Sequence, residues 1–267
     1  MTEARSPDFV EALARGLEVI KAFGERQRSL TLAEVAAAAG LARPTARRIL
    51  ITLGELGYVR GEDGSFSLTA RVLELGTAYV SSSSLWTLAR AHLRDLVRLT
   101  NESCSIAVLD GSDIVYVARV AVPKLVTLSV DIGTRFPAAQ TSLGKVLLAY
   151  LPAEEFDRAL AAPSRSAVTA TWRPDRGELE RELDKVRTQG WASTDQQLAP
   201  AIRSIAAPLR DGSRQVVAAV NVNAHAAETS LEILTEVYLP LLLDTASAIT
   251  ADIVQWSARP LEVLEPQ

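Results

Sequence analysis

A helix, a glycine turn and a second helix follow one another early in the chain, and this pattern constrains the fold most strongly. Thr31 and Glu34 have the spacing of a capping box, which predicts a helix over about 31–39. Gly40 then supplies the positive φ that a tight interhelical turn often demands. The second helix is expected over about 43–56, with a proline tolerated in its first turn. The pattern predicts a helix-turn-helix.

The segments on either side of this motif complete a small domain. Apolar residues at helical spacing predict another helix over 9–24, which ends at Gly24. On the other side, two short extended segments at 58–60 and 65–68 are joined by Gly61-Glu62-Asp63-Gly64, which is typical of a β-hairpin. Three helices followed by a hairpin predict a winged helix-turn-helix.

Positive charge is concentrated in this motif, although the net charge of the whole chain is −4. Residues 26–60 contain six arginines and two glutamates. A basic patch on an acidic protein suits contact with a polyanion through one module. The second helix fits the major groove of DNA, and the hairpin would lie along the backbone or minor groove. The candidate DNA-binding residues are Arg28, Thr31, Arg43, Pro44, Thr45, Arg47, Arg48 and Arg60.

The hydrophobic period changes to two after about residue 100. Strands are expected at 103–109, 114–120, 126–130, 191–194, 204–209 and 216–223, and helices at about 141–151, 153–161, 175–189 and 230–256. Strands that enclose several helices predict an α+β domain. The four serines Ser81–Ser84 indicate a break between domains. We therefore expect a DNA-binding domain over 1–70, linker helices over 71–100 and a second domain over 101–267.

Polar residues interrupt the apolar strands of this second domain. Asn221 and Asn223 stand two apart, so both point to one face of their strand. A helix is expected to begin near 139–143, where free backbone N–H groups favour a carboxylate. Apolar walls with a few convergent polar groups are typical of small-molecule sites. The candidate ligand-binding residues are Ala139, Gln140, Thr141, Ser142, Leu143, Asp195, Ser204, Asn221 and Asn223. The alternative is that the two asparagines face water on a one-sided sheet.

No catalytic or metal-binding pattern emerges from the sequence. Gly144-Lys145 lacks the remainder of a phosphate-binding loop. His92 and His225 are isolated, and the single cysteine, Cys104, is expected to be a small buried hydrophobe. We therefore expect no enzyme activity, no metal and no cofactor. Two alternatives stay open: an enzyme with a DNA-binding arm, and a DNA-binding or partner-docking protein without a small-molecule ligand.

The two ends of the chain bear on its location. The first residues lack the apolar core of a signal peptide. The apolar stretch 231–256 is interrupted by four acidic residues, so it is expected to be a poor membrane span. The sequence favours a cytoplasmic protein without membrane contact.

The whole chain resembles the IclR family of transcriptional regulators. In the N-terminal part the resemblance rests on ALARGLEVIKAF, LTLAEVAAAAGLARPTARRIL and LGYVR. In the C-terminal part it rests on FPAAQTSLGKVLLAYL, GWASTDQQ and IRSIAAPLRD followed by VVAAVNVNAH. The last set is most similar to the PcaR/PobR-like branch, which controls the catabolism of aromatic acids.

The resemblance implies a GAF-like effector-binding domain, a homodimer or a dimer of dimers, and an inverted-repeat operator in double-stranded DNA. It also implies that a small organic acid, preferably aromatic, is the effector. The sequence departs from the family pattern at Gln196 and Gln197, where many relatives carry an acidic residue, and at Ala201, where they carry glycine. These departures bear on the charge of the effector and on how closely it approaches the backbone.

Overall fold

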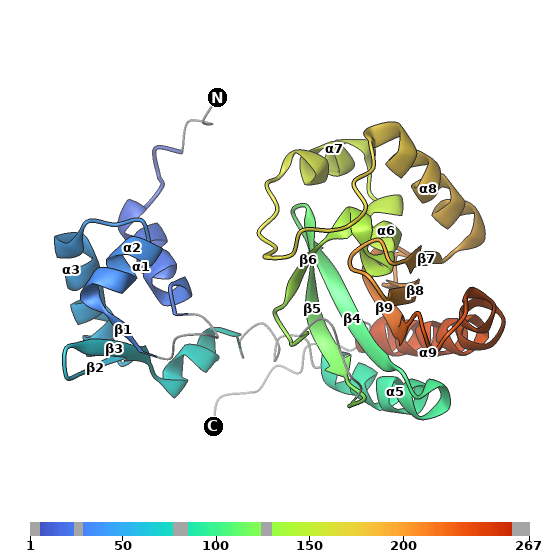
Figure 1. Cartoon of the computed structure of the whole chain (residues 1–267), viewed down its shortest axis with the longest axis horizontal. Helices are drawn as coiled ribbons and strands as arrows, with labels where there is room; N and C mark the ends of the chain where they lie inside the picture. Colours follow the sequence, from blue (N-terminus) through green and yellow to red (C-terminus); the bar gives the residue numbers. More distant parts are fainter. Residues whose placement is uncertain (1–5, 24–28, 77–84, 124–129, 258–267) are drawn as a thin grey trace, which may run out of the picture. The chain divides into compact units, whose positions relative to one another are not determined.

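The computed structural model describes residues 6–23, 29–76, 85–123 and 130–257. The chain divides into two units, residues 1–82 and 83–267, and each is described by itself (Figure 1). The expected break at Ser81–Ser84 and most of the strand expected at 126–130 lie outside the described residues.

The first unit is a winged helix-turn-helix. Its elements are α1 (Glu11–Lys21), β1 (Leu30–Thr31), α2 (Leu32–Ala38), α3 (Arg43–Glu55), β2 (Val59–Glu62), β3 (Ser65–Leu68) and the short 3-10 helix η1 (Ala70–Val72). The three strands form an antiparallel sheet in the order β1-β3-β2. The helix-turn-helix and its hairpin are confirmed, whereas the two-residue strand β1 was not expected from the sequence.

Local chemistry explains the turn between α2 and α3. Thr31 and Glu34 form the capping box in both directions, and Gly40 has a φ of +64°. Ala36 is almost fully buried at the crossing of the helices and accepts a hydrogen bond from the backbone N–H of Leu41 at 2.8 Å. A larger residue at position 36 would force the two helices apart.

The second unit is built on one six-stranded antiparallel sheet in the order β6-β5-β4-β9-β8-β7. Its strands are β4 (Ser103–Asp110), β5 (Asp113–Val120), β6 (Arg135–Pro137), β7 (Ala192–Asp195), β8 (Ile202–Arg210) and β9 (Val216–His225). The sheet and the helices around it confirm the expected α+β class.

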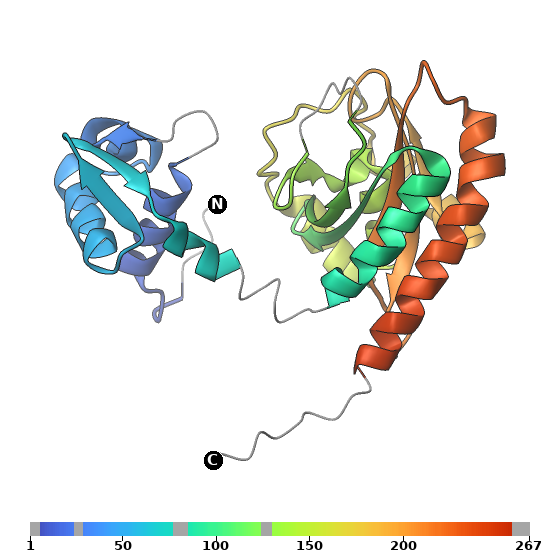
Figure 2. The same cartoon turned by 90° about the horizontal axis from the view of Figure 1, so that it is seen from below.

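Helices cover both faces of this sheet. On one face lie α5 (Leu85–Thr100) and α9 (Leu239–Ser257), which pack side by side (Figure 2). A π-helical segment, η3 (Ile233–Tyr238), leads into α9. On the other face lies α6 (Ser142–Ala149), preceded by η2 (Ala138–Gln140) and followed by α7 (Ala153–Ala161) and α8 (Arg176–Gln189). Each face therefore has its own apolar core.

The C-terminal helix is the one candidate membrane span in the described part of the chain. Residues Ile233–Trp256 are long and apolar enough for this by length and composition alone. Leu242, Ile249 and Ile253 are almost fully buried against the sheet and α5. One side of this helix therefore belongs to the core of the second unit.

Candidate DNA-binding surface and polar site

Helix α3 presents a basic, exposed surface. Arg43, Arg47 and Arg48 are exposed, and none of the three forms an ion pair with another described residue. Pro44 is exposed as well, and Thr45 is half-buried. Ala46, Leu50 and Leu53 form the opposite, buried face of the helix. Because three guanidinium groups keep their charge without an internal partner, this surface suits a polyanion.

The hairpin β2–β3 contributes one further arginine. The Nε of Arg60 donates a hydrogen bond to Ser67 Oγ at 3.0 Å across the hairpin. Thr31, by contrast, uses its hydroxyl to cap α2, so its first role is structural. Arg28 lies outside the described residues.

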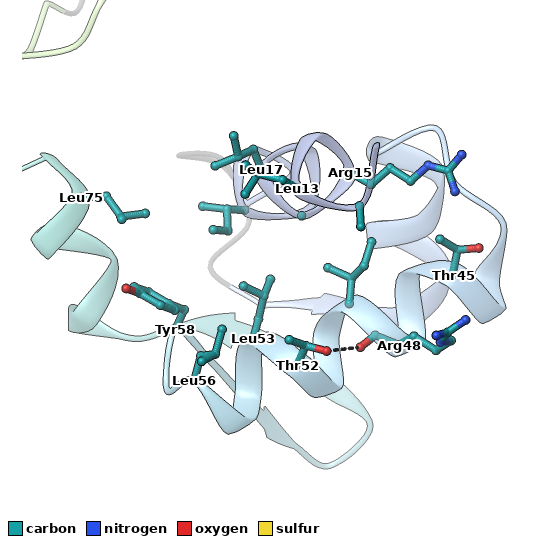
Figure 3. A pocket seen from close by; sticks show the side chains of 14 residues that line it. Leu13, Arg15, Leu17, Thr45, Arg48, Thr52, Leu53, Leu56, Tyr58 and Leu75 are labelled. Atoms are coloured by element: carbon teal, nitrogen blue, oxygen red, sulfur yellow. Dashed lines mark hydrogen bonds between the residues drawn. The ribbon is translucent and has the colours of Figure 1, made fainter. Parts of the chain in front are cut away.

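An apolar groove runs between α1 and α3 on the same unit (Figure 3). Its volume is about 520 Å³. Leu13 and Leu17 lie on its α1 side, Leu53 and Leu56 on its α3 side, and Leu75 lies at one end. Leu13 is 64% exposed and Leu75 is 50% exposed, which is unusual for leucines gathered in one place.

In the second unit, buried polar side chains meet between α6 and the sheet. Ser142 Oγ on α6 and Ser204 Oγ on β8 share a hydrogen bond of 2.7 Å. Asn221 Nδ2 on β9 donates to the same Ser204 oxygen at 3.0 Å, and Asn221 Oδ1 accepts from the backbone N–H of Ser105 at 3.2 Å. Asn221 is 2% exposed, so the alternative interpretation, in which this side chain faces water, is wrong. We call Ser142, Ser204, Asn221 and Ser105 the polar chain.

Sheet alternation explains why these residues meet. Val220 and Val222 belong to the core under α9, so Asn221 and Asn223 point to the α6 face. Ser204 is the cross-strand partner of Asn223, and Ser105 is the partner of Asn221. The sequence predicted a shared face for the two asparagines, and the register brings Ser204 to the same face.

The N-terminus of α6 is close to the polar chain, but one of its backbone N–H donors already has a hydrogen-bond acceptor. Thr141 Oγ1 accepts a hydrogen bond from the backbone N–H of Gly144 at 2.9 Å. That donor is therefore engaged, although the sequence prediction offered the whole helix start to a carboxylate. Leu143 is fully buried in the apolar core, and Ala139 packs against that core. The Oε1 atom of Gln140 is buried without a hydrogen-bond partner.

The position of α6 is fixed from two sides. A Cβ placed on Gly144 would lie 2.1 Å from the carbonyl oxygen of Ala138, so η2 and α6 touch main chain to main chain. Lys145, 1% exposed, extends to Glu182 on α8 at 3.1 Å and lies over the Trp172 ring at 4.5 Å. Burial lowers the pKa of this amine. Gly144 and Lys145 therefore hold α6 against η2 and α8.

Asp195 is not brought to the polar chain. It pairs with Arg203 across β7 and β8, and Asp195 Oδ1 accepts from Arg203 Nε at 2.7 Å. The hydrogen bond from Arg203 holds the pKa of Asp195 below its usual range. Arg203 also donates to the carbonyl oxygens of Ala226 and Thr229. By strand alternation this pair lies on the face opposite to Ser204.

The sequence interpretation missed two residues on the α6 face. Arg119 Nη1 on β5 donates a hydrogen bond to Ser105 Oγ at 3.1 Å, next to the polar chain. Tyr116 is 3% exposed, packs edge-on against Phe136 at a centroid distance of 5.7 Å, and has Asn223 as its hydrogen-bond partner. The expected strand at 114–120 contained both residues, but which of them would share a face depends on a local irregularity in the sheet.

The remaining candidate reactive groups have structural environments. His92 Nε2 lies 2.8 Å from Asp252 Oδ2, and His225 Nδ1 accepts from the backbone N–H of Ala227. Cys104 is fully buried, and burial raises its pKa to about 12, which disfavours the reactive thiolate. Within the described residues, no group of three or more His, Cys, Asp or Glu side chains could hold a metal ion.

Comparison with known families covers both units. Residues 12–63 match the IclR helix-turn-helix domain, and residues 77–251 match the bacterial transcriptional regulator IclR C-terminal domain. The chain belongs to the IclR family of transcriptional regulators. It is therefore in a class of DNA-binding regulators whose characterised members are not enzymes.

Individual relatives agree with this assignment. The chain is 40% identical to the Pca regulon regulatory protein of Pseudomonas putida, over 89% of this chain and 82% of that protein. Its fold matches a transcriptional regulator from Rhodococcus sp. RHA1 with a TM-score of 0.79 and 47% identity, over 92% of this chain and 98% of the other. It also matches the inducer-binding domain of an Acinetobacter PobR double mutant in complex with 3-hydroxybenzoic acid. That match has 28% identity and a TM-score of 0.55, and it covers 61% of this chain and 96% of the other.

Proposed function

We propose that this regulator binds an inverted-repeat operator as a dimer and responds to a small aromatic acid held between α6 and the sheet of the second unit. The observation that carries the effector site is the polar chain. Its neutral hydroxyl and amide groups lie inside an otherwise apolar core and can hold the oxygens of a small ligand. Asn223, the cross-strand partner of Ser204, adds a further amide on the same face.

The aromatic class of the effector is supported by the relatives. A domain 28% identical to this chain holds 3-hydroxybenzoic acid. A hydroxybenzoate has a flat apolar ring that suits Tyr116 and Phe136, and oxygens that suit the polar chain. The effector class and the Pca regulon relative support control of aromatic-acid catabolism, and the DNA-binding role supports action in the cytoplasm.

We propose that the groove between α1 and α3 is part of the dimer interface. One winged module makes too few contacts for tight specific binding, so two modules on two half-sites are expected. The exposed leucines of α1 and Leu75 would be buried against the same surface of a second copy. A dimer of dimers formed through the second units remains compatible with this arrangement.

The effector proposal is tested by melting and by operator release. The full chain is heated with and without 4-hydroxybenzoate, protocatechuate, 3-hydroxybenzoate and, as a control, cyclohexanol. A ligand at a hundred times its dissociation constant stabilises the folded state by about 2.7 kcal/mol, which raises the melting temperature by several degrees. The same acid should change operator affinity in a gel shift. If no acid shifts either property, the chain is a DNA-binding protein without this effector.

The dimer proposal is tested by light scattering at micromolar concentration. We expect wild type to have at least the mass of a dimer. Leu13→Asp should shift the mass towards the monomer because it places a charge in the apolar groove. Leu99→Asp is the matched control, since Leu99 is equally exposed but lies on α5 of the second unit. A monomeric wild type that still binds one half-site tightly contradicts the proposal.

A further inference from the structure

Arg119 reaches the α6 face because of a β-bulge. β4 and β5 pair in register up to Ala107 and Tyr116, and beyond the irregularity Ile106 pairs with Ala118. Val117 is the additional residue, and both Val117 and Ala118 pack in the core under α9. Simple alternation from Tyr116 would have sent Arg119 to the α9 side. A bulge that re-aims one side chain is a feature found next to functional sites.

Among the described residues, no carboxylate lies within ion-pair distance of Arg119. Within the described ranges, its side-chain hydrogen-bond partner is the neutral hydroxyl of Ser105, and it forms no ion pair. Burial lowers the pKa of its guanidinium, and Tyr116 and the carboxylate of Asp131 act in the opposite direction. The half-buried Arg135 and Arg203 of the same unit are each paired with aspartate. A guanidinium has five N–H donors, so most of the donors of Arg119 are left for another group.

Apart from Asp131, the polar side chains beside Arg119 on the α6 face are neutral. Tyr116 stays protonated at physiological pH because burial raises its pKa to about 12. Asn221 and Asn223 are amides, and Ser105 is a hydroxyl. A half-buried cation that forms no ion pair favours an anion, and a planar carboxylate fits the two-pronged guanidinium.

We infer that Arg119 is the carboxylate anchor of the effector site, so that a monocarboxylate ligand lies with its acid group at β5 and its ring between Tyr116 and α6. The inference rests on the proposed function and adds the orientation of the effector. It moves the acid group away from the N-terminus of α6, where Thr141 already engages Gly144. The polar chain then meets the ring substituents, and this separates acid recognition from recognition of the ring pattern.

The test compares an acid with its neutral isostere. Calorimetry on the full chain measures 4-hydroxybenzoate and 4-hydroxybenzamide with wild type, Arg119→Met, Arg119→Lys and Arg210→Met. We expect wild type to prefer the acid by roughly ten- to a hundredfold, as expected for a hydrogen-bonded charge pair. Arg119→Met should remove most of that preference by weakening the acid alone. The acid preference of Arg119→Lys should lie between those of wild type and Arg119→Met, since lysine keeps the positive charge but cannot donate two parallel hydrogen bonds to a carboxylate.

Arg210→Met is the matched control. Arg210 belongs to β8 of the same sheet and lies over the Tyr150 ring at 4.6 Å, so its loss should leave the preference unchanged. An acid preference that survives in Arg119→Met, or an equal loss in Arg210→Met, overturns the inference while the effector proposal stands. If wild type binds neither probe nor the other hydroxybenzoates, the effector proposal itself fails. Arg119→Lys carries the comparison if Arg119→Met does not fold.

Discussion

The two units keep their recognition groups in opposite environments. On α3 the arginines are exposed and unpaired, and the apolar residues beneath them form one small core. In the second unit the polar chain is buried between two layers, and each of its four members is hydrogen-bonded to another. An exposed cation keeps its hydration until a partner arrives, whereas a buried polar group needs its partner for folding. Substitutions should therefore affect binding alone in the first unit, and binding together with stability in the second.

The largest effect is expected on α3. Replacing both Arg47 and Arg48 with alanine should weaken operator binding by about 2–6 kcal/mol, roughly 30-fold to 20 000-fold in Kd, because each base contact is worth about 1–3 kcal/mol. The melting temperature should hardly change, since both side chains are exposed. A gel-shift titration at fixed salt measures the affinity. Arg181→Ala on α8 is the control, and unchanged operator affinity in the double variant would remove α3 from the interface.

An intermediate effect is expected at Asn221. Asn221→Leu removes the acceptor of the buried Ser105 N–H and the donor to Ser204. Leaving such a group unsatisfied costs about 1–3 kcal/mol of unfolding free energy. Effector affinity should fall roughly ten- to a hundredfold while operator binding is retained. Urea unfolding and calorimetry measure the two changes, and Gln215→Leu on the exposed side of the same hairpin is the control. If Asn221→Leu lost effector affinity without losing unfolding free energy, the expected difference between the two units would be contradicted.

The smallest effect is expected at Asp195. Its ion pair with Arg203 is solvent-exposed on one side, so Asp195→Asn should cost about 0–1 kcal/mol. Because the folded pKa lies below the ordinary value of 3.8, the pair stabilises the fold above that pH and loses its effect as the pH falls below it. Urea unfolding at pH 7 and pH 3 should show the difference between wild type and variant shrinking at pH 3. Asp244→Asn is the unpaired control, and a loss of effector affinity in Asp195→Asn would return this residue to the effector site.

The same contrast explains what the sequence could predict. The helix-turn-helix depends on residues within about ten positions of one another, such as Thr31, Glu34 and Gly40, so its elements followed from spacing. The strands of the second unit could also be predicted, from their two-residue hydrophobic period, and so could the common face of Asn221 and Asn223. Which strands are neighbours did not follow, because β4 lies beside β9 at a sequence distance that no local pattern encodes.

Arg119 illustrates the limit most clearly. A period of two assigns each residue of a strand to a face only while the pairing is regular. One additional residue at Val117 reverses the assignment for all that follow, and it can be recognised only against the partner strand. The pairing of Asp195 with Arg203 has a similar origin, because it depends on the register of two strands.

The contact between Gly144 and Ala138 bears on any attempt to retune this protein as a biosensor. Position 144 lies in the first turn of the helix beside the proposed effector site, so it is a natural choice for randomisation, yet even a methyl group there would meet main-chain atoms at 2.1 and 2.4 Å. Main chain cannot rotate out of the way as a side chain can. We expect any side chain at position 144 to displace η2 or α6, so diversity is better placed on the strand residues that face α6.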